Sequence, residues 1–336
     1  MNFYRKKLFL AIFSILLMVA FSCNHGNKYK GFPEELAKLS IQIDKHPKDA
    51  NNYYLRAKYY YQNRQAEEGL QDIQKAIELK NDEVSFYILL ADLYFAQKET
   101  DLTEETLQKA ISIDPKSNEV RLKLAELYFH LGQIAEAEST LQEAINLQPH
   151  NPRAQLIRAF CCKANGDTTG YLRMLQLTID QDASSVRAYL EIGYYYQQQL
   201  NPIAIQYYHN ALKVEPNNLE INYNLAKLYQ DLGEIDPAEE TYNIVLQIDP
   251  NHIGALNNLG FIRFVLQNRY EEAIVYFDRI LQIKPTFLPA LANRGNVFIE
   301  MKEYDKARQD FQQCLSVDPN YETALKALQF LDKNKK

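Results

Sequence analysis

Histidines are the side chains of this 336-residue chain best suited to metal binding or acid–base chemistry. A metal site on one helix needs two of them four residues apart, and no such pair occurs among the six, His25, His46, His130, His150, His209 and His252. The chain also lacks a nucleophile elbow and a glycine-rich phosphate loop. We therefore expect no catalytic residue, no metal site and no cofactor, and a protein that is not an enzyme.

The cysteines offer no disulfide framework either. Cys161 and Cys162 are adjacent, and a bond between such neighbours would demand a distorted backbone. Cys314 stands where a small residue recurs in a helical pattern. We expect these three cysteines to be small apolar residues of a core.

Cys23 has a different context, because it directly follows an apolar run with a basic start. Three basic residues at positions 5 to 7 precede apolar residues 8–22, and that run is shorter than the roughly 20 residues of a membrane-spanning helix. The pattern predicts a signal peptide over residues 1–22, followed by a lipidated Cys23 and a tether over residues 23–32. Residues 20–23 are similar to a bacterial lipobox, although Ala20 and Phe21 depart from it.

The lipobox resemblance implies export and a lipid anchor in the bacterial envelope, since several acyl chains buried in a bilayer give stable attachment. Residues 24–30 contain no acidic residue, which favours an outer-membrane location facing the periplasm over display on the cell surface. Two alternatives remain open. Ala20 and Ser22 also satisfy the rule for ordinary signal cleavage, which would release the protein into the periplasm without lipid, and the leader could remain as an uncleaved anchor.

A small residue recurs about every 34 residues along most of the chain. The series consists of Ala57, Ala91, Ala125, Ala159, Gly193, Ala226, Gly260 and Gly295. Prolines keep the same spacing at a fixed offset, at Pro47, Pro115, Pro149, Pro216, Pro250, Pro285 and Pro319. A period of this length is typical of solenoids built from helical hairpins.

Residues 118–151 show what one unit contains. Apolar residues follow helical spacing over 122–131, stop at Gly132 and resume over 134–147, before Pro149 ends the pattern. This pattern predicts two amphipathic helices joined by a tight turn. The recurring small residue of each unit lets the two helices approach closely, because no large side chain holds them apart.

Several positions of this unit, Leu124, Ala125, Tyr128, Gly132, Ala137, Ala144 and Pro149, together resemble the tetratricopeptide repeat. The resemblance covers residues 33–336 and implies an all-α fold, a right-handed α-solenoid of about eight hairpins with an N-terminal half repeat and a polar C-terminal capping helix. Full repeats are expected near residues 50–83, 84–117, 118–151, 152–185, 186–218, 219–252, 253–287 and 288–321, and the capping helix over 321–332. One elongated domain is expected, because stacked repeats share a continuous core.

In this family the first helix of each repeat lines the inner groove, so the resemblance assigns a set of residues to a partner-binding surface. Its aromatic members are Tyr54, Tyr61, Phe95, Phe129, Phe160, Tyr194, Tyr223, Phe261 and Phe264. Aromatic side chains give a large contact area at small entropic cost, which suits the capture of a protein or peptide. The alternative is that several of these rings pack against neighbouring repeats.

Asparagines add a polar feature to the same surface in the last three repeats. Asn224, Asn258 and Asn293 share one register, and related arrays use asparagines there to hydrogen-bond the backbone of an extended peptide. Lys227 and Asn296 add polar character nearby. The first five repeats carry other residues at this register, so the asparagine ladder is confined to one end of the groove.

These features predict a non-catalytic scaffold in the bacterial cell envelope that holds a protein or peptide segment in a concave groove. The 37 basic and 43 acidic side chains become more acidic in balance once the basic leader is removed, which argues against nucleic acid as a partner. The alternatives are a pilotin-like assembly chaperone for an outer-membrane complex and a glycan-binding module.

The fourth repeat departs most from the pattern. Cys162, Tyr171, Thr178 and Ala183 replace the usual Tyr, Ala, Ala and Pro, and the next repeat is one residue shorter. Ordinary sequence drift explains these changes, and a hinge or a dedicated partner site in this repeat is the alternative.

Overall fold

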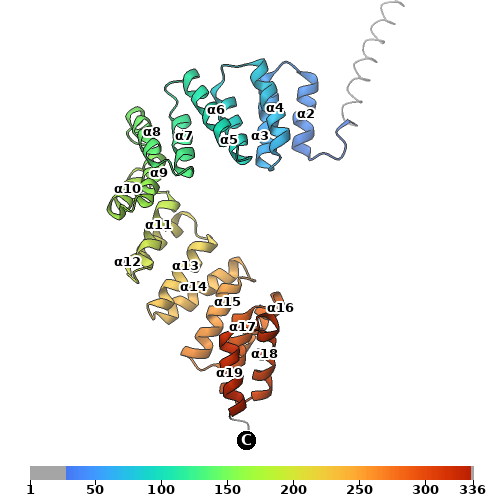
Figure 1. Ribbon diagram of the computed structural model, residues 1–336, viewed down its shortest axis with the longest axis vertical. Coiled ribbons are helices and arrows are strands. Elements are labelled where there is room, and N and C mark those ends of the chain that lie inside the picture. Colours follow the sequence, from blue (N-terminus) through green and yellow to red (C-terminus); the bar gives the residue numbers. More distant parts are fainter. Residues whose placement is uncertain (1–27, 334–336) are drawn as a thin grey trace, which may run out of the picture. The chain divides into compact units, whose positions relative to one another are not determined.

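The computed structural model describes residues 28–333, and this part of the chain is helical, without β-strands. Figure 1 labels the α-helices of the described chain. In chain order the helices are α2 (Glu34–Lys45), α3 (Ala50–Gln62), α4 (Ala66–Leu79), α5 (Val84–Ala96), α6 (Thr100–Ile113), α7 (Asn118–His130), α8 (Ile134–Leu147), α9 (Pro152–Ala164), α10 (Thr168–Gln181), α11 (Val186–Gln197), α12 (Ile203–Val214), α13 (Leu219–Asp231), α14 (Ile235–Ile248), α15 (Ile253–Phe261), the π-helical turn η1 (Ile262–Leu266), α16 (Tyr270–Ile283), α17 (Leu288–Glu300), α18 (Tyr304–Val317) and α19 (Glu322–Lys333). Eight successive hairpins follow the half repeat α2 and precede α19, so the predicted all-α solenoid is confirmed. The predicted signal peptide, Cys23 and the start of the tether lie outside the described residues.

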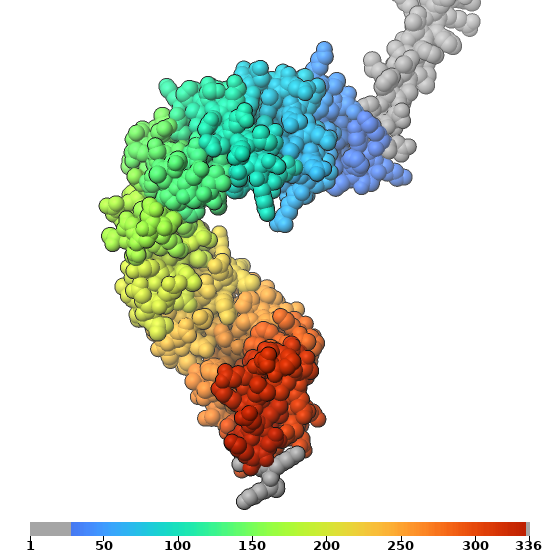
Figure 2. All heavy atoms as spheres, in the orientation of Figure 1, coloured from blue at the N-terminus to red at the C-terminus, as the bar shows by residue number. Residues whose placement is uncertain are grey.

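The chain divides into two compact units at the boundary between Tyr171 and Leu172. Unit 1 contains α2 and the hairpins from α3 to α8, with α9 packed on the last of them. Unit 2 contains the hairpins from α11 to α18, with α19 packed on the last of them. The boundary lies within α10, the second helix of the repeat that departs most from the sequence pattern. Figure 2 shows the helices of unit 1, coloured from blue to green, packed against one another in chain order on the face in view.

Each hairpin turns through one residue with a positive φ angle, seven or eight positions after the recurring small residue. These residues are Arg64, Lys98, Gly132, Gly166, Leu200, Gly233, Asn268 and Lys302. Glycine adopts this left-handed conformation without steric cost, whereas a side chain makes it unfavourable. The predicted interruption at Gly132 is therefore the turn itself, and the four turns with Arg, Lys or Leu are strained versions of it.

The core of each hairpin is a small residue on the first helix packed against a large one on the second. In unit 2 the glycines face aromatic rings: a Cβ added to Gly260 would lie 2.7 Å from Cε1 of Phe277, and Gly193 and Gly295 stand equally close to Tyr208 and Phe311. In unit 1 the alanines pack with aliphatic partners instead, in the pairs Ala57 with Ile73, Ala91 with Leu107, and Ala125 with Leu141. A first helix that carries glycine in place of alanine is therefore matched by a larger, aromatic side chain on the second helix, so the total volume of the pair changes little. The pair of Ala226 and Tyr242 is the exception.

The two end helices lack the small residues that a hairpin contact needs. On α2, exposed Glu35 and Gln42 occupy the register of Gly69 and Ala76. On α19, exposed Gln329 occupies the register of Gly295. α19 stands at the place of the predicted polar capping helix, and it also exposes two apolar residues, Leu325 and Phe330, at 39% and 50%. Their apolar surface stays uncovered because no second helix packs on α19 in the described chain.

The first helix of the seventh repeat absorbs one extra residue. α15 continues directly as the π-helical turn η1, and the turn residue Asn268 follows Gly260 by eight positions, whereas Gly233 follows Ala226 by seven. A π-helical turn contains one residue more than an α-helical turn. The extra residue is therefore contained within the first helix, and α16 still packs against α17. None of the described helices combines the length and the hydropathy needed to cross a membrane.

Candidate functional site

First helices of successive repeats contact one another within each unit. In unit 1, α3 contacts α5 and α7 contacts α9; in unit 2, α11 contacts α13, and α15 contacts α17. These helices make a surface that we call the first-helix face. It carries the aromatic and asparagine residues that the sequence assigns to partner binding.

A row of four rings crosses the first-helix face of unit 1. The rings of Phe95 on α5 and His130 on α7 have centroids 5.6 Å apart. His130 lies 5.7 Å from Phe129, and Phe129 lies 6.3 Å from Phe160 on α9. Three of these residues were predicted from the sequence, and His130 joins them into one aromatic row that spans three repeats.

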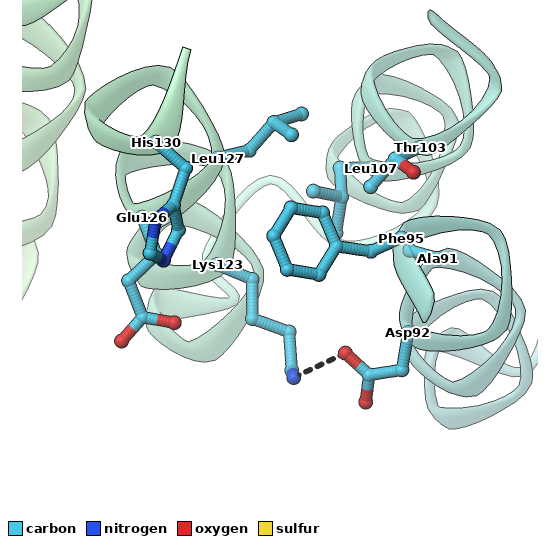
Figure 3. Close-up of a pocket in the computed structure, with 9 residues that line it drawn as sticks. All are labelled: Ala91, Asp92, Phe95, Thr103, Leu107, Lys123, Glu126, Leu127 and His130. Atoms are coloured by element: carbon cyan, nitrogen blue, oxygen red, sulfur yellow. Dashed lines mark hydrogen bonds and ion pairs between the residues drawn. The ribbon is translucent and has the colours of Figure 1, made fainter. Parts of the chain in front are cut away.

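A cavity of about 80 Å³ opens beside Phe95 at one end of this row. Ala91, Leu107 and Leu127 form its buried apolar walls, and the 41% exposed ring of Phe95 forms part of its mouth. Figure 3 shows the ring of Phe95 projecting from α5 into the space in front of α7. Liquid water occupies about 30 Å³ per molecule, so the cavity has room for one aliphatic side chain and not for a drug-sized ligand.

Charged residues surround the same cavity, and they are paired with one another. Lys123 Nζ donates to Asp92 Oδ1 at 2.6 Å, which links α7 to α5 (Figure 3). Glu126 accepts two hydrogen bonds from Arg153 of α9, at 2.8 and 3.0 Å. Burial raises the pKa of the Asp92 carboxyl, and the hydrogen bond from Lys123 opposes that rise. The pairs tie three first helices together and balance the charges that lie beside the aromatic row and the cavity.

Unit 2 holds a hydrogen-bonded chain behind its first-helix face. Tyr242 on α14 is fully buried, and its hydroxyl donates to Gln230 Oε1 on α13 at 2.8 Å. The same hydroxyl accepts from Asn258 Nδ2 on α15 at 2.7 Å. Burial raises the pKa of Tyr242, so this hydroxyl keeps its proton at all physiological pH values. The chain of bonds fixes the amide of Asn258 from inside the core.

The other asparagines of the ladder differ in their contacts. Asn293 Nδ2 donates to Asn257 Oδ1 at 3.3 Å, which links α17 to α15. Asn224 is half-buried, and no hydrogen bond of its side chain is found in the described chain. Asn296 lines an open depression of about 380 Å³ between α17 and α19. The three ladder residues therefore lie on three successive first helices, as their register predicts, but they are not equivalent.

The remaining predicted residues divide between exposed and packed positions. Tyr194 and Tyr61 are 47% and 39% exposed, and Lys227 is exposed with its ammonium 3.9 Å from Asp231. Tyr54 stacks on the buried ring of Phe86 with centroids 5.1 Å apart. Phe264 packs against the core formed by α15, α16 and α17. The ring of Tyr223 lies 4.8 Å from that of His252 in a tilted arrangement, and Phe261 is half-buried. The packing of Tyr54 and Phe264 therefore matches the alternative stated above, in which the aromatic side chain packs against neighbouring repeats and does not face a partner.

Sequence reasoning missed four residues that build the cavity in unit 1: Asp92, Lys123, Glu126 and His130. A signal existed for Lys123, because it occupies the register of Asn258 in the third repeat. No such signal existed for Asp92 or His130. Their contribution depends on which side chains of neighbouring repeats meet across the first-helix face.

The described residues of the site offer rings, amides and an apolar cavity as binding surfaces. Cys161 and Cys314 are buried core residues, as expected from the sequence, and burial raises the pKa of the Cys161 thiol to about 12 and that of Cys314 to about 11. Within residues 28–333, no group of three His, Cys, Asp or Glu side chains is arranged to hold a metal ion. The arrangement favours contact with another molecule through rings, amides and an apolar cavity.

Family models described as tetratricopeptide repeat match residues 54–118, 98–161, 203–259 and 289–321. Together they cover more than half of the chain. The chain belongs to the tetratricopeptide repeat family. The tetratricopeptide repeat (TPR) fold is generally non-catalytic and indicates a scaffold for protein–protein interaction.

Known TPR proteins resemble this chain over parts of their length. Human protein O-mannosyl-transferase TMTC3 is 22% identical over 171 residues, which cover 46% of this chain and 19% of that protein. The CTR9 homolog of Arabidopsis thaliana is 31% identical over 131 residues, which cover 38% of this chain and 12% of that protein. The chain thus matches about a fifth or less of these two curated relatives.

A solved TPR structure supports the fold over a larger share of the chain. The C-terminal part of a TPR repeat-containing protein from Cytophaga hutchinsonii superposes with a TM-score of 0.61 at 17% identity. The superposition covers 71% of this chain and 98% of that one. The superposition supports the assignment of the helical solenoid fold and gives no information on partners.

Proposed function

We propose that this TPR protein is a non-catalytic scaffold that holds an extended segment of a partner protein on the first-helix face of unit 1. The observation that carries the proposal is the aromatic row from Phe95 to Phe160 with the apolar cavity at its end. An aliphatic side chain of the partner fills the cavity, and its neighbouring residues lie across the rings. The paired charges of Lys123 and Arg153 border this path without offering a free charge to the partner.

The size and composition of the face favour a peptide over a small metabolite. Pockets for drug-sized ligands measure about 300–1,000 Å³ and enclose most of the ligand. The cavity beside Phe95 is several times smaller and lies on an open surface. A shallow face with rigid rings and one side-chain pocket instead suits a chain that makes many small contacts along its length.

The proposal is tested with a linear peptide selected from a random phage-displayed library against the full chain. Phe95→Ala removes the exposed ring at the cavity mouth and should weaken peptide binding about tenfold, the loss typical of a central interface aromatic. Tyr304→Ala is the matched control, because Tyr304 is a similarly exposed aromatic on the second helix α18. Circular dichroism should show equal helicity for both variants, since Phe95 is substantially exposed.

Equal affinity of the wild type and Phe95→Ala for every selected peptide would overturn the assignment of this face. Binding of an oligosaccharide on a glycan array, lost in Phe95→Ala, would favour the glycan-binding alternative instead. Mislocalisation of one oligomeric membrane protein after deletion of the gene would favour an assembly chaperone. These three readouts use the same variants or their parent strain, so they separate the candidate functions directly.

We further propose that a lipid on Cys23 anchors the scaffold in the bacterial envelope, at the outer membrane and facing the periplasm. The support is the sequence pattern around Cys23, which lies outside the described residues. Within the described part of the predicted tether, Lys28 and Tyr29 both donate to Asp44 of α2, at 2.8 to 2.9 Å, so this end of the tether is fixed to the first helix of the array.

The anchor is tested by fractionation of bacterial cells grown with a labelled fatty acid. Cys23→Ser should move the protein to the soluble fraction and abolish labelling, because the acceptor thiol is absent. Cys162→Ser should leave both unchanged. Cys23→Ser protein that stays in the membrane and keeps the label would contradict lipidation at this residue, and soluble, unlabelled wild type would favour secretion without lipid.

A further inference from the structure

We infer that one end of unit 1 is a bilayer-contact surface, where exposed lysines and an aromatic side chain meet anionic lipid headgroups beside the lipid on Cys23. This surface, the basic end surface, lies on the segment before α2, the last turn of α2 and the loop after it. It consists of Lys28, Lys30, Phe32, Lys45, His46 and Lys48, which are all exposed. The inference rests on the proposed lipid anchor and is independent of the peptide-binding face.

The first step is the small number of residues between Cys23 and the array. Five residue steps separate Cys23 from Lys28, and a fully extended chain spans at most about 3.6 Å per step, so their Cα atoms lie within about 18 Å of each other. The polar headgroup region on each side of a bilayer is itself about 5–8 Å deep. A lipid on Cys23 therefore holds Lys28 close to the headgroups, whatever the path of the chain between them.

The second step is that the segment before α2 is bound to the C-terminal end of that helix. Lys28 Nζ donates to the two carboxylate oxygens of Asp44 at 2.8 and 2.9 Å, and the Tyr29 hydroxyl donates to the same carboxylate at 2.8 Å. Asp44 directly precedes Lys45, the last residue of α2. These bonds bring the segment close to the loop that joins α2 to α3, so the lysines before and after α2 form one surface.

The third step is the local charge. Residues 28–48 contain five lysines and three acidic residues, whereas the whole chain has 37 basic and 43 acidic side chains. Two of the three carboxylates are paired inside this region, Asp44 with Lys28 and Glu34 with Lys38. Within residues 28–333, no ion pair is found for the other three lysines, at positions 30, 45 and 48. An acidic protein thus has a basic end next to its proposed lipid, which matches it to anionic headgroups.

The fourth step is an aromatic side chain among these lysines. Phe32 is 46% exposed, and its ring centroid lies 5.5 Å from that of Tyr29. The backbone N–H of Phe32 donates to the Tyr29 carbonyl at 3.1 Å, so a tight turn presents Phe32 at the surface. An aromatic ring can enter the apolar boundary of a bilayer while long lysine side chains keep their ammonium groups in the headgroup layer. Phe32 and its neighbouring lysines therefore suit contact with lipid.

The short chain to Cys23 also argues against a protein as the occupant of this surface. A globular domain of 100 residues has a radius of gyration of about 13 Å, so it is too wide for a gap of at most about 18 Å between Lys28 and the lipid anchor. α2 is the end helix of unit 1 and packs on α3 (Figure 1). Contact through the basic end surface therefore holds unit 1 with α2 toward the bilayer.

The contact is tested with tryptophan fluorescence, because the natural chain contains no tryptophan. The lipid-bearing Phe32→Trp protein is purified from membranes and added to vesicles of phosphatidylethanolamine and phosphatidylglycerol whose acyl chains carry bromine, which quenches tryptophan on contact. We expect a loss of emission relative to vesicles without bromine. Leu147→Trp is the matched control and should keep its emission, because Leu147 is 44% exposed at the end of α8, which five helices separate from α2 in unit 1.

The role of charge is tested in the Phe32→Trp background. Lys45→Glu combined with Lys48→Glu should abolish the quenching, because two cations become anions beside anionic headgroups. Lys109→Glu combined with Lys116→Glu makes the same change in net charge at exposed positions of unit 1 on and after α6, and should leave the quenching intact. Replacing phosphatidylglycerol with phosphatidylcholine should also reduce the quenching.

Three outcomes would overturn the inference. They are no quenching of lipid-bearing Phe32→Trp, equal quenching of Phe32→Trp and Leu147→Trp, and quenching that is unaffected by the lysine reversals and by the charge of the vesicle. Each would leave the proposed anchor intact, because the fatty-acid label is measured on the same protein. Absence of that label from the wild type would overturn the anchor itself, and peptide affinity at the Phe95 site reports separately on the scaffold function.

Discussion

Gly260 and Phe277 provide a direct measure of how the small residue of each repeat sets the contact between its two helices. Phe277 is fully buried, and its ring carbons would lie 2.7, 2.9 and 3.2 Å from a Cβ added to Gly260. Carbon atoms in favourable contact are about 3.5–4.0 Å apart, so the methyl group of Gly260→Ala would force the ring or the helix to move. Replacing Phe277 with leucine should relieve this clash, because in unit 1 an alanine at the same register packs with leucine, as Ala125 does with Leu141.

The magnitude follows from two opposing terms. Overpacking a closed core costs about 1–3 kcal/mol, whereas alanine in place of glycine within a helix gains about 1 kcal/mol. Gly260→Ala in the wild-type background should therefore lower the free energy of unfolding by roughly 0–2 kcal/mol. In the Phe277→Leu background the strain is absent, and the same substitution should raise it by about 1 kcal/mol. The coupling energy of the double-mutant cycle is the strain itself, about 1–3 kcal/mol.

Hydrogen exchange of amides in α15 and α16 is the suitable assay, because it reports local opening in a repeat array that need not unfold in one step. Ala226→Gly is the control, since it removes a buried methyl group at the same register opposite Tyr242 and should lower stability through lost helix propensity and lost packing, with no strain to relieve. Additive effects in the cycle, within about 0.3 kcal/mol, would refute the idea that volume is exchanged across this contact.

Three further substitutions test other parts of the fold. Leu200→Gly should raise the thermal midpoint and add about 0.5–1 kcal/mol of stability, because the turn at Leu200 has φ +51° and strains any side chain there; an unchanged or lower midpoint would count against the turn argument. Asp310→Ala should lower stability by about 3 kcal/mol in urea unfolding, since it removes a carboxylate that is 5% exposed and leaves the paired guanidinium of Arg294 without it; a loss below about 1 kcal/mol would mean that solvent or Asp278 replaces the pair. Burial raises the pKa of Asp92 in the folded state, so its contribution to stability is greatest below the unfolded pKa of about 3.9 and is lost as pH rises through the folded pKa. The stability of Asp92→Asn relative to the wild type should therefore increase from pH 4 toward neutrality in melting experiments, and a difference independent of pH would contradict the raised pKa.

The helical repeat could be predicted from the sequence because it depends on local and periodic features. Gly132 marks a turn, Pro149 ends a helix, and Ala125 recurs with its counterparts at almost constant spacing. Each of these residues acts within its own repeat or on the next one, so a short-range pattern carries the information. The eight hairpins of the described chain follow that pattern from α3 to α18.

The candidate site was only partly predictable. Register alone places Asn258 and Phe95 on first helices, but it does not show that Tyr242 engages the amide of Asn258 from behind, or that Phe95 borders a cavity. It also does not separate Tyr54, which stacks on Phe86, from rings that stay exposed. These distinctions depend on side chains of neighbouring repeats that are far apart in sequence.

The amino-acid sequence by itself determined the architecture of this protein: helical hairpins of nearly constant length, a small residue at each helix contact, and a proline or a turn where each helix ends. Tertiary structure alone decided which groups can meet a partner, since hydrogen bonds and ring contacts between repeats consume some of them. Asn258 keeps an oxygen and gives up its nitrogen for this reason. A periodic sequence encodes positions along helices, whereas the free atoms at a surface depend on distances of a few ångströms between repeats, and only folding sets those distances.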